Sequence, residues 1–260
     1  MRIHVREEGN GPAVLLIHGW PTSSHLWRQC IPPLARQRRV LAIDLPGFGR
    51  SDKPLDASYS FRFFDRVLDG TLDALGVDSV ALAVHDLGGP VGLHWAVQHF
   101  ERVRALGLLN TLVYPEPSWA VIAFVAASYL PGLRSYLTSP LGLEHALKLG
   151  LGDAKRATPE AIAGVQAPFD TRASRKALLK AAHGLHPGGM QTIARRLSEY
   201  RGPVRIVYGA RDRILPDVAK TMQRVARDLP QAEVTCLHDC GHFLQEERGE
   251  AIGELLAEIF

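Results

Sequence analysis

Cysteine is scarce in this sequence of 260 residues. Its three cysteines, Cys30, Cys236 and Cys240, are odd in number and show no repeated CxxC spacing. That pattern favours neither a disulfide framework nor a zinc site, so we expect reduced thiols. No cluster of metal ligands stands out, and Gly47 and Gly49 do not follow a GxGxxG spacing. We therefore expect no metal, no nucleotide and no other cofactor.

A strong excess of one charge and a long hydrophobic run are also lacking. The formal net charge is +3 and the basic residues are scattered, which excludes the usual pattern of a nucleic-acid binder. The apolar stretch from Trp119 to Leu130 ends at Pro131-Gly132, short of the roughly 20 residues that span a bilayer. We expect a buried or pocket-lining helix there and no membrane partner. Residues 1–5 lack the apolar core of a secretory signal, which predicts a cytoplasmic protein.

Apolar runs typical of buried strands recur along most of the chain. They cover Ala13–Ile17, Val40–Ile43, Val80–Val84, Ala105–Leu109, Val204–Tyr208 and Glu233–Leu237. Amphipathic stretches such as Phe61 to Leu75 separate most of them. Continuous apolar strands alternating with helices predict an α/β fold with a mostly parallel central sheet and helices on both faces. In such sheets the ligand site lies at the carboxyl ends of the strands.

The alternation of strands and helices breaks between about Val113 and Arg201. Prolines, glycines and helix-like segments replace strand patterns in this interval. We therefore expect a core made of residues 1–112 and 201–260, and an inserted helical cap made of residues 113–200 that lies over the site.

Asp86 is the most informative candidate residue. It follows the apolar run Val80–Val84 and precedes a segment with helical spacing, so it lies on a tight turn from strand to helix. Such a turn is a nucleophile elbow, which pushes its side chain out of the sheet edge. Gly88 and Gly89 allow the following helix to pack close to the strand behind it.

Other polar motifs follow the remaining strands in a characteristic order. They are His18-Gly19-Trp20-Pro21, the segment Asp44-Leu45-Pro46-Gly47-Phe48-Gly49-Arg50-Ser51-Asp52-Lys53-Pro54, His85-Asp86-Leu87-Gly88-Gly89, Gly209-Ala210-Arg211-Asp212 and Gly241-His242-Phe243. Over nearly the whole chain this order resembles the α/β-hydrolase superfamily. An aspartate at the elbow resembles the branch of haloalkane dehalogenases and epoxide hydrolases. The segments Leu109-Asn110-Thr111 and Gln166-Ala167-Pro168-Phe169 are more similar to the dehalogenases.

The chemistry of these residue types leads to the same roles. A carboxylate such as Asp86 can displace a leaving group from an sp3 carbon and form an alkyl ester. Water must then attack that ester, with His242 as general base and Asp212 orienting and stabilising the histidine. The backbone N–H groups of Trp20 and Leu87 are the expected oxyanion donors. Asn110 is the alternative position for the orienting acid but carries no charge, which favours Asp212.

The sequence leaves the leaving group open. In the resembling dehalogenases a tryptophan that solvates the halide usually follows the nucleophile, and here that residue is Leu87. Trp20 and Trp119 are the remaining candidates. An epoxide hydrolase would instead need cap tyrosines, for which Tyr129, Tyr136 and Tyr200 are available.

The predicted function is thus a dehalogenase-like hydrolase that acts on a small apolar molecule with water as co-substrate. The alternatives are epoxide hydrolysis through the same ester, or a non-catalytic ligand-binding homologue of the same fold.

Overall fold

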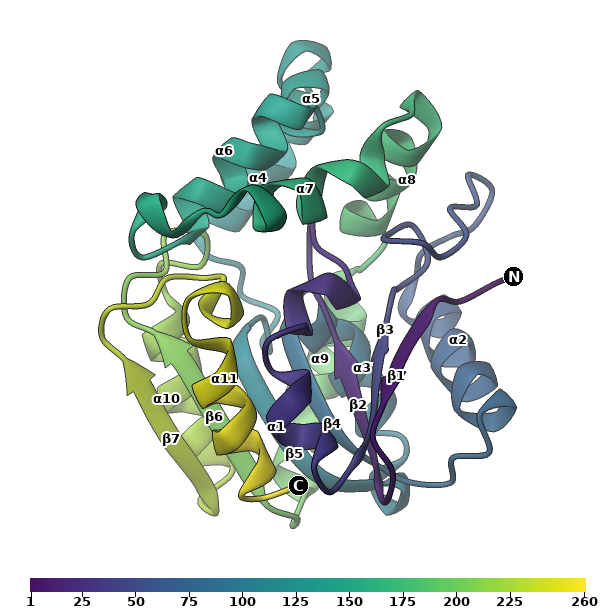
Figure 1. Cartoon of the computed structure of the whole chain (residues 1–260). Coiled ribbons are helices and arrows are strands. Elements are labelled where there is room, and N and C mark those ends of the chain that lie inside the picture. The colour runs from purple at the N-terminus through teal and green to yellow at the C-terminus, as the bar shows by residue number, and fades with distance from the viewer.

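The computed structural model describes residues 1–260 and contains one sheet of seven strands (Figure 1). The strands are β1 (Val5–Glu8), β2 (Ala13–Ile17), β3 (Arg39–Ile43), β4 (Val80–Asp86), β5 (Val103–Thr111), β6 (Val204–Gly209) and β7 (Ala232–Leu237). Their order in the sheet is β1-β3-β2-β4-β5-β6-β7, and only β1 is antiparallel to its neighbour. The prediction of a mostly parallel sheet is confirmed, and the six expected strands are present with small shifts of their ends.

Helices cover both faces of this sheet. The helices are α1 (Ile31–Ala35), α2 (Phe61–Ala74), α3 (Gly88–Ala96), α4 (Trp119–Tyr129), α5 (Pro131–Leu137), α6 (Pro140–Gly150), α7 (Pro159–Gln166), α8 (Arg172–His183), α9 (Pro187–Arg196), α10 (Val218–Asp228) and α11 (Leu244–Ala257). Helices α1 and α11 lie in front of the sheet in Figure 1, and α3, α9 and α10 lie behind it.

Strand β2 illustrates why both faces need cover. All five of its residues are buried. Val14 and Leu16 pack with α1 and α11, whereas Leu15 and Ile17 pack in the larger core on the opposite face. Side chains alternate between the two faces of a strand, so a continuous apolar strand is stable only between two layers of helices.

Helices α4 to α8 come between β5 and β6 in the chain and lie above the carboxyl edge of the sheet (Figure 1). No single helix is long and apolar enough to cross a membrane, although α4 and α5 together, bent by 112°, meet this criterion of length and composition.

Of the two expectations for the apolar segment 119–130, burial is wrong for half of its residues, which are exposed, whereas Ser128 and Tyr129 do line a groove. Within α4 only Ser128 is buried, and Trp119 is 70% exposed. The physical reason is that α4 is apolar on every side but has core beneath it on one side only.

Candidate active site

Asp86 is the last residue of β4 and has a left-handed backbone conformation, with φ of 51°. A non-glycine residue with positive φ is uncommon and indicates a constrained turn. The turn is held by the Thr111 hydroxyl, which donates to the carbonyl oxygen of Asp86 at 2.6 Å. A Cβ at Gly88 would lie 2.5 Å from the carbonyl oxygens of Ile17 and His18, so the close approach of α3 to β2 requires glycine there.

The two carboxylate oxygens of Asp86 contact different groups. Oδ1 accepts a hydrogen bond of 2.7 Å from the backbone N–H of Trp20. The backbone N–H of Leu87 also stabilises the charged form of the carboxylate and so lowers its pKa. Oδ2 lies 3.3 Å from Nε2 of His242. Oδ1 is therefore bound by a backbone donor, while Oδ2 faces an imidazole.

His242 lies between two carboxylates. Its Nδ1 is 2.8 Å from Oδ2 of Asp212, and its side chain is fully buried. Asp212 is held in turn by the backbone N–H groups of Ile214 and Leu215, which donate to Oδ1 at 2.8 and 2.7 Å. The structure thus brings Asp86, His242 and Asp212 into one chain of contacts, although 126 residues separate Asp86 from Asp212.

Asn110 is a part of this site for which the sequence suggested no role. Its amide nitrogen donates to Oδ2 of Asp212 at 2.8 Å and to the carbonyl oxygen of Gly241 at 3.0 Å. Its amide oxygen accepts from the backbone N–H of Gly209 at 2.9 Å. Asn110 therefore fixes the Asp212 carboxylate and the loop that carries His242. The available signal was a polar residue directly after a buried strand, at the sheet edge where the other candidates lie.

The ionisation of the cluster follows from these contacts. Burial opposes ionisation of Asp86, but the contacts with His242, His85 and the Leu87 N–H outweigh it and lower the pKa of Asp86. Burial likewise opposes a charge on His242, but Asp212 and Asp86 outweigh it and raise the pKa of His242 to about 10. In the free protein near neutral pH the site is therefore a buried imidazolium between two carboxylates.

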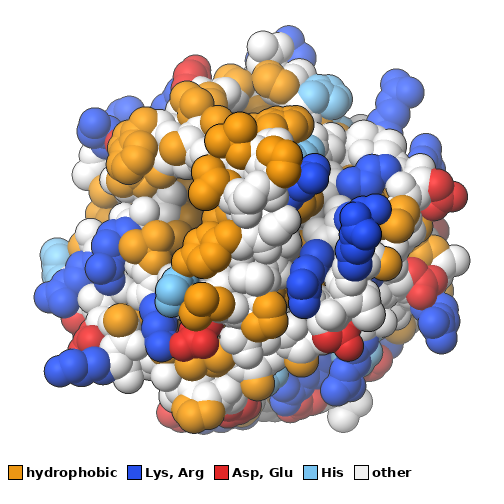
Figure 2. Space-filling model, turned by 90° about the horizontal axis from the view of Figure 1, so that it is seen from above, with side chains coloured by type: hydrophobic (Ala, Val, Ile, Leu, Met, Phe, Trp, Pro, Cys, Tyr) orange, Lys and Arg blue, Asp and Glu red, His pale blue; other side chains and the backbone are white.

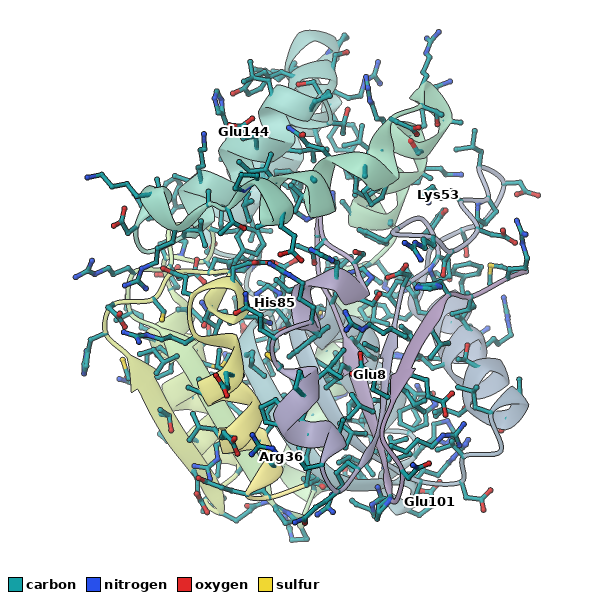
Figure 3. The ribbon with its side chains drawn as sticks, in the orientation of Figure 1. Glu8, Arg36, Lys53, His85, Glu101 and Glu144 are labelled. Carbon is teal, nitrogen blue, oxygen red and sulfur yellow. The ribbon has the colours of Figure 1, made fainter.

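His85 and His18 support the site without joining the chain of contacts. Nε2 of His85 is 2.9 Å from the carbonyl oxygen of His242, and the two rings lie 4.7 Å apart. Burial lowers the pKa of His85 to about 3, so this ring is neutral. In Figure 3 His85 lies at the top of the core, below the helices that carry Glu144. His18 accepts from the backbone N–H of Leu45 at 3.0 Å and contacts the carbonyl oxygen of Gly19 at 2.9 Å, which braces the loop before Trp20.

Asp44 has a structural place beside the site. Its two carboxylate oxygens accept from the backbone N–H groups of Ser24 and Arg50, both at 2.7 Å. A Cβ at Gly49 would lie 2.0 Å from this carboxylate, which explains the glycine-rich turn. No group of three or more His, Cys, Asp or Glu side chains is arranged to hold a metal ion.

The structure does not bring Trp119 to this cluster. Trp119 begins α4 and is 70% exposed, whereas Asp86, His242 and Asp212 are all buried. Its predicted contact with substrate is therefore not supported, because the first turn of α4 points its tryptophan to solvent.

The tyrosines considered for epoxide opening are also occupied elsewhere. Tyr129 stacks on His183 and Tyr136 hydrogen-bonds His145. The hydroxyl of Tyr200 donates to the carbonyl oxygen of Val103.

Comparisons with known proteins show the family and support the fold. Residues 12–249 match a family model described as alpha/beta hydrolase fold. The chain is 30% identical to a haloalkane dehalogenase of Agrobacterium fabrum, over 98% of this chain and 87% of the relative. It is 31% identical to haloalkane dehalogenase 2 of Mycobacterium bovis, over 100% and 91%. The crystal structure of the haloalkane dehalogenase DbeA from Bradyrhizobium elkani superimposes with a TM-score of 0.85 at 29% identity, covering 98% of this chain and 92% of DbeA.

Proposed function

Because the chain belongs to the alpha/beta hydrolase fold family and is a haloalkane dehalogenase-like hydrolase, we propose that it hydrolyses small apolar haloalkanes through an alkyl ester on Asp86. The observation that carries this proposal is the unequal environment of the Asp86 carboxylate. One oxygen is bound by the N–H of Trp20 at 2.7 Å, and the other faces His242 at 3.3 Å. A carboxylate held in this way suits attack on carbon followed by hydrolysis of the ester it forms.

In the first step Oδ2 of Asp86 attacks the carbon that carries the halogen. The new C–O bond forms as the carbon–halogen bond breaks, and the halide leaves with the bonding electron pair. Oδ1 becomes the carbonyl oxygen of the ester and keeps the hydrogen bond from Trp20. This step consumes the charge of Asp86, one of the two carboxylates that raise the pKa of His242.

In the second step His242 acts as general base. Loss of the Asp86 charge lowers the pKa of His242, so the imidazolium releases its proton to solvent and the neutral ring then accepts one from water. The water oxygen attacks the ester carbonyl, and the negative charge develops on Oδ1 near the N–H groups of Trp20 and Leu87. Collapse breaks the bond to the alkoxide, which takes the proton from His242 and leaves as the alcohol. The carboxyl group left on Asp86 passes its proton to His242, which restores the initial ion pair. Asp212 keeps the imidazole oriented throughout.

Trp20 is the candidate donor to the departing halide. Its indole N–H is buried and has no hydrogen-bond partner, while its backbone N–H already binds Asp86. An unpartnered buried donor on a residue that contacts the nucleophile is suited to solvate an anion that forms there.

In this proposal the helices α4 to α8 form the cap over the active site. Phe124 of α4 packs against Trp20 with ring centroids 4.7 Å apart, which links the cap to the loop that binds Asp86. A cap boundary at residue 200 would include α9, which packs against α3 behind the sheet. We therefore assign α9 to the core.

The test uses His242→Phe, which removes the base but leaves the nucleophile. After incubation with a panel of bromoalkanes and epoxides, intact-protein mass spectrometry should find one alkyl group from a bromoalkane on Asp86, with release of one bromide per protein. His238→Phe is the matched control, because His238 is exposed and its loss should leave turnover intact with no adduct. Absence of any adduct across the panel, or adducts from epoxides alone, would overturn the proposal.

A further inference from the structure

The segment that runs from the end of β5 into the first turn of α6 carries an exposed apolar surface that the proposed reaction does not use. We call it the apolar crest, and its large exposed side chains are Trp119, Ile122, Tyr129, Leu130, Leu133, Tyr136 and Leu141. Residues 117–143 contain a single charged residue, Arg134. The flanking carboxylates are neutralised, since Glu116 pairs with Arg224 at 3.1 Å and Glu144 with Lys148 at 2.6 Å. Exposed apolar patches of this extent mark an interaction surface.

A strongly basic groove adjoins the crest. It has a volume of about 730 Å³, and its lining includes five cations and no carboxylate: Arg134, Arg172, Arg175, Lys176 and Lys180. None of these five side chains takes part in an ion pair within the chain. Tyr129 and Arg134 line the groove and also lie in the crest segment, so the two features form one continuous surface.

The position of these cations on α8 is unfavourable for the helix itself. Arg172 and Arg175 lie in its first turn, and no acidic residue is present there. The amino end of a helix carries partial positive charge and favours carboxylates, so two arginines there cost stability. Arg175 also donates to the carbonyl oxygens of Phe169 at 2.9 Å and Asp170 at 3.3 Å, so the fold accounts for part of its position. Arg172 has no hydrogen bond or ion pair within the chain and is available to an external anion.

Both features face the same way. Figure 2, which views the molecule from above the helices, shows hydrophobic side chains gathered over one part of this face and Lys and Arg side chains beside them. In Figure 1 α5 is the outermost element at the top of the molecule. A protruding apolar crest with cations at its side matches an interfacial membrane anchor, whose apolar residues enter the acyl boundary while basic residues meet anionic headgroups.

We propose that this surface docks the protein on anionic lipid bilayers, with the apolar crest inserted at the interface and the basic groove on lipid phosphates. Trp119 and Tyr129 have the amphipathic rings that favour the headgroup level. A second copy of the chain fits this surface less well than a bilayer does. A symmetric contact through this face would bring two basic grooves together without any carboxylate to neutralise them. The proposal departs from the sequence-based expectation of no membrane partner, which considered only spanning segments.

Docking would orient the active site toward the lipid. The underside of α4 carries Phe124 against Trp20, and the backbone of Trp20 binds Asp86, so the proposed nucleophile lies beneath this part of the crest. Apolar substrates concentrate in bilayers, and docking would supply them from there. This consequence rests on the proposed function, whereas the docking itself does not.

The experiment is vesicle co-sedimentation of the full chain. We expect binding to phosphatidylcholine vesicles that contain phosphatidylglycerol, weaker binding to phosphatidylcholine alone, and a fall in binding as salt is raised. Arg172→Gln/Lys176→Gln should lower the partition coefficient by about 30-fold, from about 1 kcal/mol for each cation. Ile122→Gln/Leu133→Gln should lower it by at least about tenfold through lost apolar burial.

Matched controls remove the same groups elsewhere. Lys220→Gln/Arg227→Gln takes one lysine and one arginine from α10, where both are exposed and unpaired, and Val234→Gln replaces an exposed apolar residue of β7. These variants should bind vesicles like the parent, and so should Asp86→Asn, whatever its effect on turnover. The proposal is overturned if the parent binds neither vesicle, if controls and crest variants lose binding equally, or if the crest variants instead dissociate a dimer in analytical ultracentrifugation.

Discussion

Replacement of Gly19 by alanine should block the nucleophile while leaving the fold intact. A Cβ at this position would lie 2.3 Å from Cβ of Asp86 and 2.5 Å from its Oδ1. Carbon atoms in contact are normally at least about 3.4 Å apart, so Asp86 or the loop before Trp20 must move by about 1.1 Å. Asp86 cannot rotate away freely, because its backbone is held by Thr111 at 2.6 Å.

The size of the effect follows from that displacement. A misplacement of about 1 Å at a reacting atom costs roughly 100-fold in rate, or about 2.7 kcal/mol in the barrier. The hydrogen bond from the Trp20 N–H to Oδ1 would be lost in the same movement. We therefore expect ester formation on Asp86 to slow by at least about 100-fold.

The assay isolates the first chemical step. Gly19→Ala is combined with His242→Phe, and the rate of alkyl adduct formation with a bromoalkane is followed by intact-protein mass spectrometry. Gly70→Ala in the same background is the control, because a Cβ at Gly70 meets no atom within 4 Å and alanine favours its helix. Thermal unfolding verifies that both variants fold. An unchanged rate of adduct formation in folded Gly19→Ala would refute the reasoning.

Three further predictions concern the charges of the site. Asp86→Asn should lower the pKa of His242 from about 10, because it removes one of two adjacent carboxylates. An NMR titration of the His242 ring protons measures this pKa. An unchanged value would contradict the ion pair between Asp86 and His242. The raised pKa of His242 means that its protonated form stabilises the folded state. This contribution to the free energy of unfolding should be complete below pH about 6.5 and be lost as pH rises through about 10. Urea denaturation across this range should show the decline in the parent protein but not in His242→Phe. Asp212→Asn should slow ester hydrolysis by about 10⁴-fold while still permitting alkylation, so that ester accumulates on Asp86 during turnover; parent-like turnover without adduct would exclude this role.

The titration of His242 has a consequence for the catalytic cycle. In the free protein two carboxylates keep it protonated, and a protonated imidazole cannot act as a base. In the proposed cycle, alkylation of Asp86 would remove one of these charges and so prepare His242 to act as base in the second step. The proposed order of the two steps would then follow from the electrostatics of one buried cluster.

Much of this molecule was accessible from local sequence patterns. Strand β4 was predicted from a run of buried apolar residues, and the turn at Asp86 from its place between that run and a helical pattern. Both are properties of a few neighbouring residues, which is why periodicity and turn chemistry suffice to predict them. The position of the chemistry-bearing residues at the carboxyl ends of parallel strands follows from the fold class.

The contacts that join distant segments were not accessible in the same way. The bond from Asn110 to Asp212 spans 102 positions, and the sequence offers no periodicity that pairs an amide with that carboxylate. The resemblance suggested only that an acid stands at one of the two positions.

What the sequence by itself determined is the α/β fold, the order of its strands along the chain and the candidates Asp86, His242 and Asp212. Only the tertiary structure decided which apolar residues are buried. The run from Trp119 to Leu130 is as hydrophobic as a core helix, yet half of its residues are exposed and only Ser128 is buried. Burial depends on whether another layer packs against a helix and not on the helix alone. The same reason explains the different surroundings of two tryptophans. Neighbouring segments enclose Trp20 beside Asp86, whereas Trp119 faces solvent.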